Sequence, residues 1–321
     1  MVTAARTLAD VSESELLREI FPFFPSSAAL SVGPGDDAAV LRTGPATVAT
    51  TDSMVRGRDW LDEWSTAGDV ATKVLTQNLA DVAAMGAIST AILVSLVAEP
   101  ATRLDWAVDF ARVLGERASA AGVVVAGGDL SSAPTGVLMV SVTALGDLGE
   151  HQPVLRSGAR PGHVVAVNGT LGRSAAGLAL LQGGADPLTV TDGIPRSCLA
   201  QHLRPVAPLA AGPEAARAGA SAMIDLSDGL LRDGHRIAEA SGVRLALSPT
   251  GLLDDHAALE PVVGDAAWEC VLAGGEEHSL LATFPGDVPD GWRTIGLVEA
   301  GAGVTLDGAV QQARGWDHFR A

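Results

Sequence analysis

Several residue types are scarce in this chain of 321 residues, and each shortage excludes a class of protein. The two cysteines, Cys198 and Cys270, lie far apart and match no metal-site spacing, so we expect buried free thiols in a reducing compartment. Lys73 is the only lysine, and no Gly-x-x-x-x-Gly-Lys-Ser/Thr loop is present, which excludes a standard P-loop NTPase. The protein-kinase motifs are missing too. The seven histidines are scattered, without a pair at metal-site spacing.

Long apolar runs and excess positive charge are also absent. The longest apolar runs, such as residues 91–98, are too short to cross a bilayer. Residues 1–10 lack a basic segment followed by an apolar one, so we expect no signal peptide and a cytoplasmic protein. The formal net charge of −17 argues against nucleic acid or an anionic membrane as partner. An acidic protein can still bind phosphates if divalent cations lie between the like charges.

What is present indicates a globular protein with two domains. Hydrophobic residues make up 47 % and charged residues 18 % of the chain, which is long enough for two cores. The pattern predicts helices at 68–85 and 104–120 and strands at 47–51, 88–97, 123–126 and 137–145, followed after a hinge at 151–160 by a second mixed set. Since helices and strands do not alternate strictly, we predict an α+β fold of two mixed α/β domains, residues 1–149 and 150–321.

Residues 222–231 carry the most informative motif. Three apolar residues indicate the end of a buried strand, and the residues after the turn are typical of an amphipathic helix. Between them lie Asp225, Ser227 and Asp228, with Asp228 where an N-capping side chain belongs and Gly229 at the turn. Carboxylates and a hydroxyl between a strand end and a helix suit a hydrated metal ion and a phosphate. The alternative is an ordinary capped turn.

The pattern of an acid at the edge of an apolar strand recurs at Asp36, Asp52 and Asp129, and Asp81 shares a helix face with Asn78. Taken singly, each acid is more readily explained as a turn former or a solvated residue. If they gather in one cleft, as we expect, each close pair repels by roughly 1 to 4 kcal/mol. Cations must then lie between them, and oxygen ligands without a histidine or cysteine cluster favour Mg²⁺. Since Mg²⁺ shares phosphates, a nucleotide is the expected third partner.

An ordered set of motifs resembles the thiamine-monophosphate kinase family, within the superfamily of aminoimidazole ribonucleotide synthetase. The set consists of Gly35-Asp36-Asp37, Thr51-Asp52, Asn78-Leu79-Ala80-Asp81, Gly127-Gly128-Asp129, Arg156-Ser157-Gly158-Ala159, Ile224-Asp225-Leu226-Ser227-Asp228-Gly229-Leu230, Gly274-Gly275-Glu276 and Gly315-Trp316-Asp317-His318-Phe319. The resemblance implies transfer of the γ-phosphate of ATP to thiamine monophosphate with several Mg²⁺ ions, in a homodimer. Residues 1–149 would carry the metal- and nucleotide-binding acids and the dimer interface, and residues 150–321 would complete the ATP and substrate site.

The resemblance also implies roles for single residues. The metal ligands would be Asp36, Thr50, Thr51, Asp52, Asp81, Asp129, Asp225 and Asp228. ATP would be bound by Gly128, Asp129, Arg156 and Ser227, the thiamine part by Asp59, Glu276 and Trp316, and catalysis would depend on Asp52, Asp228 and Arg156. Two positions depart from the family pattern. Asp59 stands where many relatives have histidine, and Glu277-His278 stand where they have aspartate and an aromatic residue.

The acceptor phosphate is already ionised near neutral pH, so an in-line transfer needs no general base, and Arg156 with Mg²⁺ would offset the charge. Core packing stays open as an alternative for Trp316, and a solvated turn for Glu276. Residues 169–172 with Ser174 could hold a phosphate, although a tight strand-to-helix turn is the simpler interpretation. Lys73 and Arg173 are expected to be solvated or salt-bridged.

Two other functions stay open. Another ATP-dependent synthetase or kinase of the superfamily is disfavoured, because no reactive cysteine precedes Cys198, the chain does not end in one, and residues 315–319 fit the kinase better. A non-catalytic protein that binds nucleotide or metal with the same acids is the alternative from a different class.

Overall fold

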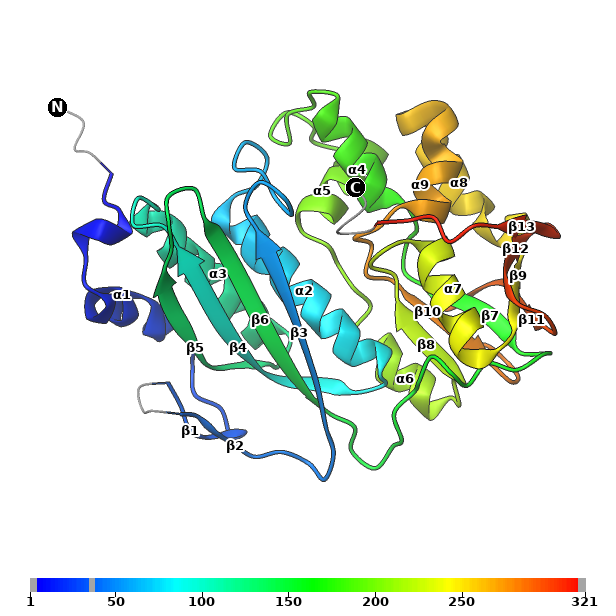
Figure 1. Cartoon of the computed structure of the whole chain (residues 1–321), viewed down its shortest axis with the longest axis horizontal. Helices are drawn as coiled ribbons and strands as arrows, with labels where there is room; N and C mark the ends of the chain where they lie inside the picture. The colour runs from blue at the N-terminus through cyan, green and yellow to red at the C-terminus, as the bar shows by residue number, and fades with distance from the viewer. Residues whose placement is uncertain (1–4, 35–37, 317–321) are drawn as a thin grey trace. The chain divides into compact units, whose positions relative to one another are not determined.

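The computed structural model describes residues 5–34 and 38–316, and the chain divides into two compact units (Figure 1). Unit 1 comprises Met1–Val82 and Ser89–Gly149, and unit 2 comprises Ala83–Ile88 and Glu150–Ala321. The short segment Ala83–Ile88 therefore belongs with the second half of the chain, which the sequence pattern did not indicate. Both units combine sheets with helices, so the predicted mixed α/β fold class is confirmed.

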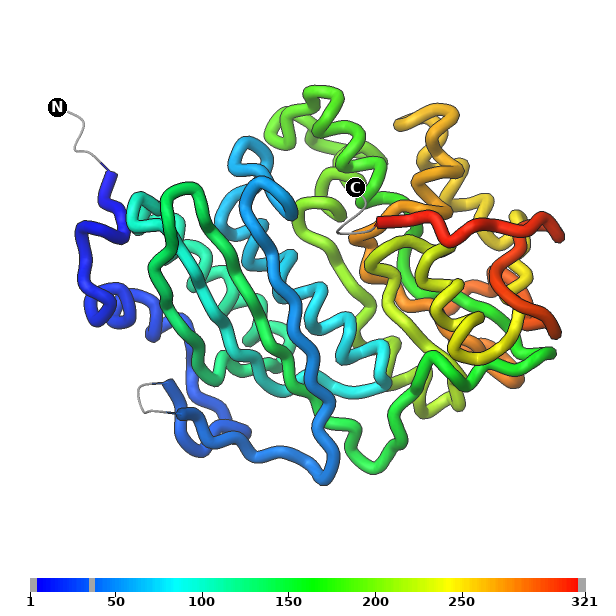
Figure 2. Tube along the Cα trace, in the orientation of Figure 1, coloured from blue at the N-terminus to red at the C-terminus, as the bar shows by residue number. Residues whose placement is uncertain are grey.

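Unit 1 is built on a four-stranded sheet. Its strands, in spatial order, are β3 (Thr47–Val55), β6 (Leu138–Asp147), β4 (Ile88–Ala98) and β5 (Val124–Ser132). Strands β3 and β6 are antiparallel and run side by side along their length, with Asp52 opposite Val142 (Figure 2). Strands β4 and β5 are parallel, with Ser95 opposite Asp129. Strands β3 and β5 are consequently the two edges of this sheet.

Helices α2 (Ala67–Ala84) and α3 (Leu104–Ala120) lie behind the sheet in the view of Figure 1 and cover one of its faces. Alternate residues of β6 are buried on that face, as the period of two in a half-buried strand requires. The helices contribute Val74 and Val82 from α2 and Phe110 and Leu114 from α3, at helical spacing. The predicted helices at 68–85 and 104–120 are thus confirmed.

The remaining elements of unit 1 are α1 (Glu13–Ile20), the 3₁₀ turns Leu8–Asp10 and Phe21–Phe23, and a two-stranded sheet of β1 (Leu30–Val32) and β2 (Val40–Leu41). Helix α1 begins with a capping box, in which Glu15 N donates to Ser12 Oγ and Ser12 N donates to Glu15 Oε2. The β1–β2 sheet packs at one end of the four-stranded sheet, where Leu30 and Leu41 lie against a small core that includes Ala91.

Asp52 and Asp129 lie inside strands, whereas the sequence pattern predicted that each lies at the end of a strand. Strand β3 continues through Asp52 to Val55, because β6 pairs with it as far as Met139. Strand β5 continues past Asp129 to Ser132, because β4 pairs with it over the same stretch. The backbone hydrogen bonds of a neighbouring strand therefore extended both strands beyond their apolar runs.

Unit 2 is built on a seven-stranded sheet. The spatial order is β13 (Ala309–Gln311), β12 (Gly303–Leu306), β9 (Arg244–Leu247), β11 (Arg293–Glu299), β7 (Val164–Asn168), β10 (Leu280–Phe284) and β8 (Ala222–Asp225). The β12–β9 pair is parallel and the other pairs are antiparallel. The helices are α4 (Arg173–Gln182), α5 (Gly193–Leu203), α6 (Ala211–Arg217), α7 (Leu230–Ser241), α8 (Leu253–Val263) and α9 (Ala267–Ala273), with 3₁₀ turns at Pro249–Leu252 and Gly264–Ala266.

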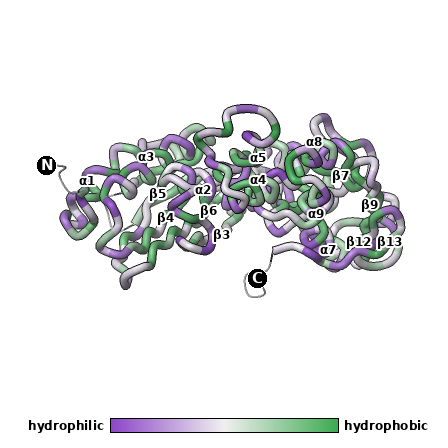
Figure 3. Tube along the Cα trace, turned by 90° about the horizontal axis from the view of Figure 1, so that it is seen from above, coloured by the Kyte–Doolittle hydropathy of each residue, from purple (hydrophilic) through white to green (hydrophobic). Residues whose placement is uncertain are grey.

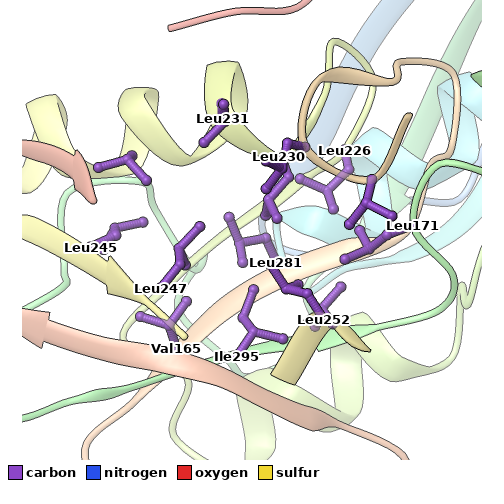
Figure 4. Close-up of a cluster of buried hydrophobic side chains, with 14 of the residues drawn as sticks. Val165, Leu171, Leu226, Leu230, Leu231, Leu245, Leu247, Leu252, Leu281 and Ile295 are labelled. Atoms are coloured by element: carbon purple, nitrogen blue, oxygen red, sulfur yellow. The ribbon is translucent and has the colours of Figure 1, made fainter. Parts of the chain in front are cut away.

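The largest core of unit 2 lies between this sheet and its helices (Figure 4). Leu226 and Leu230 flank the turn from β8 into α7, and both are almost fully buried in that core. Burying a leucine side chain contributes about 1.5 to 3 kcal/mol, so the two residues fix the turn from both sides. The acids of this turn are therefore held by a rigid base.

Hydrophobic and hydrophilic residues are interspersed along the trace (Figure 3). Among residues 5–34 and 38–316, no helix combines the length and the apolar composition needed to span a bilayer.

Candidate functional site

In unit 1, three predicted metal ligands lie on β3 and α2, where the helix crosses the strand. Thr50 Oγ1 donates a hydrogen bond to Asp81 Oδ2 at 2.8 Å. Asp52 lies two residues further along β3, on the same face of the strand, and its backbone N donates to Asn78 Oδ1 at 3.0 Å. Asn78 is fully buried and its Nδ2 donates to Val74 O at 2.8 Å, so the amide is fixed. The helix face predicted from Asn78 and Asp81 therefore meets the strand that carries Asp52.

Thr51 and Asp129 lie apart from this group. The Thr51 side chain is on the opposite face of the sheet, where its Oγ1 donates to Val142 O at 3.0 Å. Asp129 is exposed on β5, the other edge strand, and its Oδ2 accepts a hydrogen bond from Ser131 Oγ at 2.7 Å. Gly128 is required for packing, because a side-chain carbon there would clash with the carbonyl oxygen of Val94 on β4. Within unit 1 the chain does not bring Asp129 to Asp52. Asp36 lies outside the described residues.

Asp59 and Lys73 meet beside the end of β3. Asp59 Oδ2 accepts a hydrogen bond from Val55 N at 2.7 Å, which closes the turn after the strand. Lys73, on α2, is only 4 % exposed, and its Nζ donates to the backbone O of Asp59 at 3.5 Å. Of the two expectations for Lys73, the solvated one is therefore wrong, and the salt-bridged one stays a prediction. Its long aliphatic stem allows burial, while the ammonium group reaches a backbone acceptor.

In unit 2, the turn after β8 is held by the loop at residues 274–279. Leu226 N donates to Ser279 O, and His278 N donates back to Leu226 O. Glu276 N donates to Ser227 O at 2.7 Å. Asp225 is the last residue of β8, as predicted, and its buried carboxylate lies 3.3 Å from His278 Nδ1. This loop therefore continues the pairing of β8 and β10 beyond the sheet.

Asp228 is not the N-cap of α7, contrary to the sequence prediction. The N-cap is Gly229, with φ +115°, a conformation that favours glycine. The backbone N–H groups of Asp228 and Gly229 instead donate to Asp233 Oδ2, at 3.0 and 3.1 Å. Asp233 is fully buried inside the first turn of the helix, and burial together with the nearby charge of Asp225 raises its pKa to about 7. An acid in the first turn was the only signal in the sequence for this role.

The Asp228 carboxylate is bound by arginines of α7. Arg236 Nη2 donates to Asp228 Oδ2 at 2.5 Å, and its Nη1 donates to Asp233 Oδ1 at the same distance. Arg232 Nε lies 3.6 Å from Asp228 Oδ2. Asp225, Asp228 and Asp233 therefore form an acidic group in unit 2 whose charge is partly neutralised by helix α7 itself.

Glu276 and Glu277 follow the predicted Gly-Gly pair but have different surroundings. Glu276 Oε2 lies 3.3 Å from His202 Nδ1, and the backbone of Glu276 has φ +57°. Glu277 is almost fully buried, and its carboxylate accepts hydrogen bonds from Thr170 Oγ1 and, at 2.9 Å, from Ser174 N. Burial raises the pKa of Glu277 above its ordinary range. Glu277, which departs from the family pattern, is thus a buried residue that anchors the loop at residues 274–279.

The phosphate cradle considered for residues 169–172 is not formed. The carboxylate of Glu277 occupies the N-terminus of α4, where a phosphate would bind, and Leu171 N donates to Asp255 Oδ1 at 3.2 Å. A strand-to-helix turn capped by buried acids is the correct interpretation, and Arg173 is half-buried beside it.

Trp316 and Arg156 lie at the surface of unit 2. Trp316 N donates to Asp228 O at 3.0 Å and its side chain is 40 % exposed, which argues against the core-packing alternative. Arg156 is exposed, and its carbonyl oxygen accepts a hydrogen bond from Ser241 Oγ. A shallow pocket of about 360 Å³ lies along residues 151–158, next to Ala216, Ala220 and Ser221. Arg156 lies within this stretch but is not part of the lining, and none of the other predicted site residues that the structure describes lines the pocket.

The donor sets of both units fit Mg²⁺ by their chemistry. Thr50, Asp52 and Asp81 in unit 1 and Asp225 and Asp228 in unit 2 offer hydroxyl and carboxylate oxygens. Within the described part of the chain, no three His, Cys, Asp or Glu side chains stand close enough together to hold a metal ion. Mg²⁺ is usually bound by one or two carboxylates together with water and substrate phosphates, so sets of this size suit Mg²⁺ carried on a nucleotide.

Comparison with known proteins gives consistent results. Residues 35–148 match the family model described as AIR synthase related protein, N-terminal domain. The chain is 43 % identical to thiamine-monophosphate kinase of Mycobacterium tuberculosis, over 99 % of this chain and 95 % of that protein. The crystal structure of thiamine-monophosphate kinase from Stenotrophomonas maltophilia K279a matches with a TM-score of 0.83 at 32 % identity, covering 94 % of this chain and 98 % of that one. AaThiL complexed with AMPPCP and TMP matches with a TM-score of 0.77 at 30 % identity, covering 85 % and 87 %.

Proposed function

The chain belongs to the thiamine-monophosphate kinase family, and we propose on this premise that it transfers the γ-phosphate of ATP directly to thiamine monophosphate to give thiamine diphosphate. The observation that carries the proposal is 43 % identity extending over 99 % of the chain. The complex of AaThiL with AMPPCP, an ATP analogue, and TMP supports ATP and thiamine monophosphate as the two substrates.

The transfer is an in-line attack by an oxygen of the acceptor phosphate on the γ-phosphorus of ATP. The P–O bond to the new oxygen forms as the bond to ADP breaks, so atoms and charge balance without a general base. The obstacle is the repulsion between two polyanions. Mg²⁺, when bound, would neutralise part of this charge. Arg156 is exposed on its loop, where its guanidinium could bind phosphate oxygens, and Ser227 would orient the nucleotide from the turn after β8.

We assign the proposed Mg²⁺ ligands within each unit. In unit 1, Asp52 and the hydrogen-bonded pair of Thr50 and Asp81 form one set. In unit 2, Asp225 and Asp228 form the other, next to the arginines of α7. We keep two further roles that the family resemblance implies. These are metal binding by Asp36, Thr51 and Asp129, and ATP binding by Gly128 and Asp129.

A homodimer would account for the position of Asp129. The face of the four-stranded sheet turned away from α2 and α3, called here the open face, carries Asp129 with Thr51, Val55 and Leu93. Val55 and Leu93 are 39 % and 40 % exposed. A second chain that covered this face would remove these apolar side chains from water. We propose that a second copy covers this face, and that Thr51 and Asp129 act there.

The thiamine moiety carries a cationic ring, which suits an aromatic face and a carboxylate. Trp316 offers a partly exposed indole next to Asp228. Glu276 offers a carboxylate that is held near His202, and we propose that it offsets the charge of the ring. Asp59 is proposed as a third contact, although its carboxylate also closes the turn after β3.

A direct assay tests the proposal. The purified chain is incubated with ATP, Mg²⁺ and thiamine monophosphate, and thiamine diphosphate and ADP are quantified together. Stoichiometric formation of both products, dependent on this acceptor, is the expected result. Turnover of ATP with a different acceptor would instead assign the chain to another activity of the superfamily. Binding of ATP without any turnover would identify a non-catalytic nucleotide-binding protein.

A further inference from the structure

Arg236 connects two acids of unit 2 that have different environments. Its Nη2 donates to Asp228 Oδ2 and its Nη1 donates to Asp233 Oδ1, each at 2.5 Å. The side chain of Asp233 is completely buried, whereas those of Asp228 and Arg236 are 17 % and 35 % exposed. The guanidinium group therefore lies at the rim of the site, with one carboxylate below it in the protein and one beside it near solvent.

Asp233 is held in place independently of Arg236. Its Oδ2 accepts the backbone N–H groups of Asp228 and Gly229, at 3.0 and 3.1 Å, while its Oδ1 faces Arg236. Each carboxylate oxygen thus has its own partners. Because the two N–H groups belong to the turn after β8, Asp233 fixes both the backbone of Asp228 and the arginine that binds its side chain.

We propose that Arg236 is the counter-ion that holds the Asp228 carboxylate until a divalent cation binds, and that Asp233 retains Arg236 when the cation displaces it. This inference rests on the proposed function of Asp228 as a metal ligand. A cation approaching Asp228 must compete with a guanidinium group that is already bound to it. A guanidinium has several donors in a fixed plane, so it can release one carboxylate and keep the other. Asp233 and Arg236 are positioning residues, since neither is placed against the substrate.

The proposal predicts opposite effects for the two residues. Arg236→Gln removes the competing charge, so cation binding at Asp228 becomes tighter. Asp233→Asn keeps an amide oxygen for the two backbone N–H groups but removes the second anionic partner of Arg236. Arg236 then binds Asp228 alone and the cation binds more weakly. A purely structural function of the pair would weaken cation binding in both variants.

Arg232→Gln is the matched control. Arg232 also neighbours Asp228, but through Nε at 3.6 Å. Removing it lowers the local positive charge by the same amount as Arg236→Gln while leaving the bridge to Asp233 intact. We expect a smaller gain in cation affinity from this variant than from Arg236→Gln.

The test measures Mn²⁺ binding to the whole chain by electron paramagnetic resonance at pH 8, with and without AMPPCP, alongside circular dichroism. The relevant site is the one that Asp228→Asn removes. We expect its dissociation constant to fall about fivefold in Arg236→Gln and to rise about fivefold in Asp233→Asn, the scale of a partly exposed ion pair. Arg236→Gln leaves the buried carboxylate of Asp233 without its positively charged partner. If the variant fails to fold for this reason, the double variant Arg236→Gln/Asp233→Asn is tested, and it must bind Mn²⁺ more tightly than the wild type.

Unchanged or weaker Mn²⁺ binding in Arg236→Gln, or in the double variant, would overturn the inference and leave the proposed kinase activity standing. Absence of any Mn²⁺ site dependent on Asp228 in the wild type, both with and without AMPPCP, would overturn the metal-ligand function of Asp228 as well. The product assay then shows separately whether the chain is a kinase.

Discussion

Thr50 and Asp81 lie thirty-one positions apart in the chain and are joined by one hydrogen bond of 2.8 Å between Oγ1 and Oδ2. Through this bond, β3 and α2 present a hydroxyl and a carboxylate next to Asp52. The hydroxyl fixes the rotamer of Asp81, so the oxygen donors of unit 1 are ordered by the protein itself. Such ordering lowers the entropic cost of binding a cation.

Replacing Asp52 by asparagine should abolish most of the activity without unfolding the protein. The variant removes a proposed metal ligand and some like-charge repulsion, while the backbone bond from residue 52 to Asn78 is retained. Because a bound metal ion stabilises a phosphoryl transition state by several kcal/mol, we expect turnover to fall by about a hundredfold or more. Asp109→Asn, an exposed acid on α3, serves as control and should be fully active. An active Asp52→Asn enzyme would exclude this residue as a metal ligand.

Trp316→Ala should mainly impair binding of the acceptor. The side chain is 40 % exposed, so we expect the free energy of unfolding to fall by about 1 to 3 kcal/mol, a loss that leaves the protein folded. Loss of stacking on a cationic ring should raise the KM for thiamine monophosphate roughly three- to tenfold, with little change in the KM for ATP. Steady-state kinetics with each substrate varied in turn measures both constants. A strongly destabilised variant would show that the indole is needed for packing instead.

Glu277→Gln should change how stability depends on pH. Burial raises the pKa of Glu277 in the folded protein, whereas the unfolded chain has the ordinary value near 4.5. Above this pH the unfolded chain releases a proton that the folded protein retains, so the stability of the wild type falls as pH rises, by up to about 1.4 kcal/mol per unit in that window. Glutamine can still accept from Ser174 N and, through its amide, donate to Thr170.

The variant should therefore gain stability relative to the wild type as the pH rises above about 4.5, as measured by denaturant unfolding at several pH values. Glu214→Gln, at an exposed position on α6, is the matched control and should leave the pH profile unchanged. Parallel profiles for Glu277→Gln and the wild type would contradict the raised pKa of Glu277.

Leu93→Arg should disrupt the proposed homodimer. Leu93 is 40 % exposed on the open face of unit 1, so a charge there would be buried in the interface. We expect light scattering to report a dimer for the wild type and a monomer for the variant. Leu188→Arg is a suitable control, because Leu188 is 88 % exposed and belongs to unit 2, not to the open face of unit 1. A dimer in both variants would place the interface elsewhere.

The sequence predicted those features that depend on local pattern. The helical spacing of α2 and α3, the strand ending at Asp225 and the helix after Gly229 all follow from residues close together in the chain, and all are confirmed. The resemblance to the kinase family is likewise confirmed by the relatives. Its assignment of individual residues to metal, nucleotide and substrate stays a prediction.

Features that depend on contacts distant in sequence were not predictable. Nothing near Asp129 indicates that β5 becomes an edge strand, because the order of strands is decided by pairing with β4. Sequence position alone does not distinguish Asp233 from Asp228 as the acid that caps the helix. Both acids are close to the helix start, and only the backbone geometry at Gly229 decides which one accepts the free N–H groups. The burial of Glu277 could not be predicted, because its partners Thr170 and Ser174 lie about a hundred positions away in the chain.

The burial of Lys73 has a practical consequence for anyone who studies this protein by chemical labelling. Reagents directed at lysine ε-amines will find their single target shielded beneath the turn that carries Asp59. Mapping of the surface by cross-linking or mass tagging must therefore rely on the abundant carboxylates and arginines. A rise in ε-amine reactivity would in turn signal that α2 and this turn have separated.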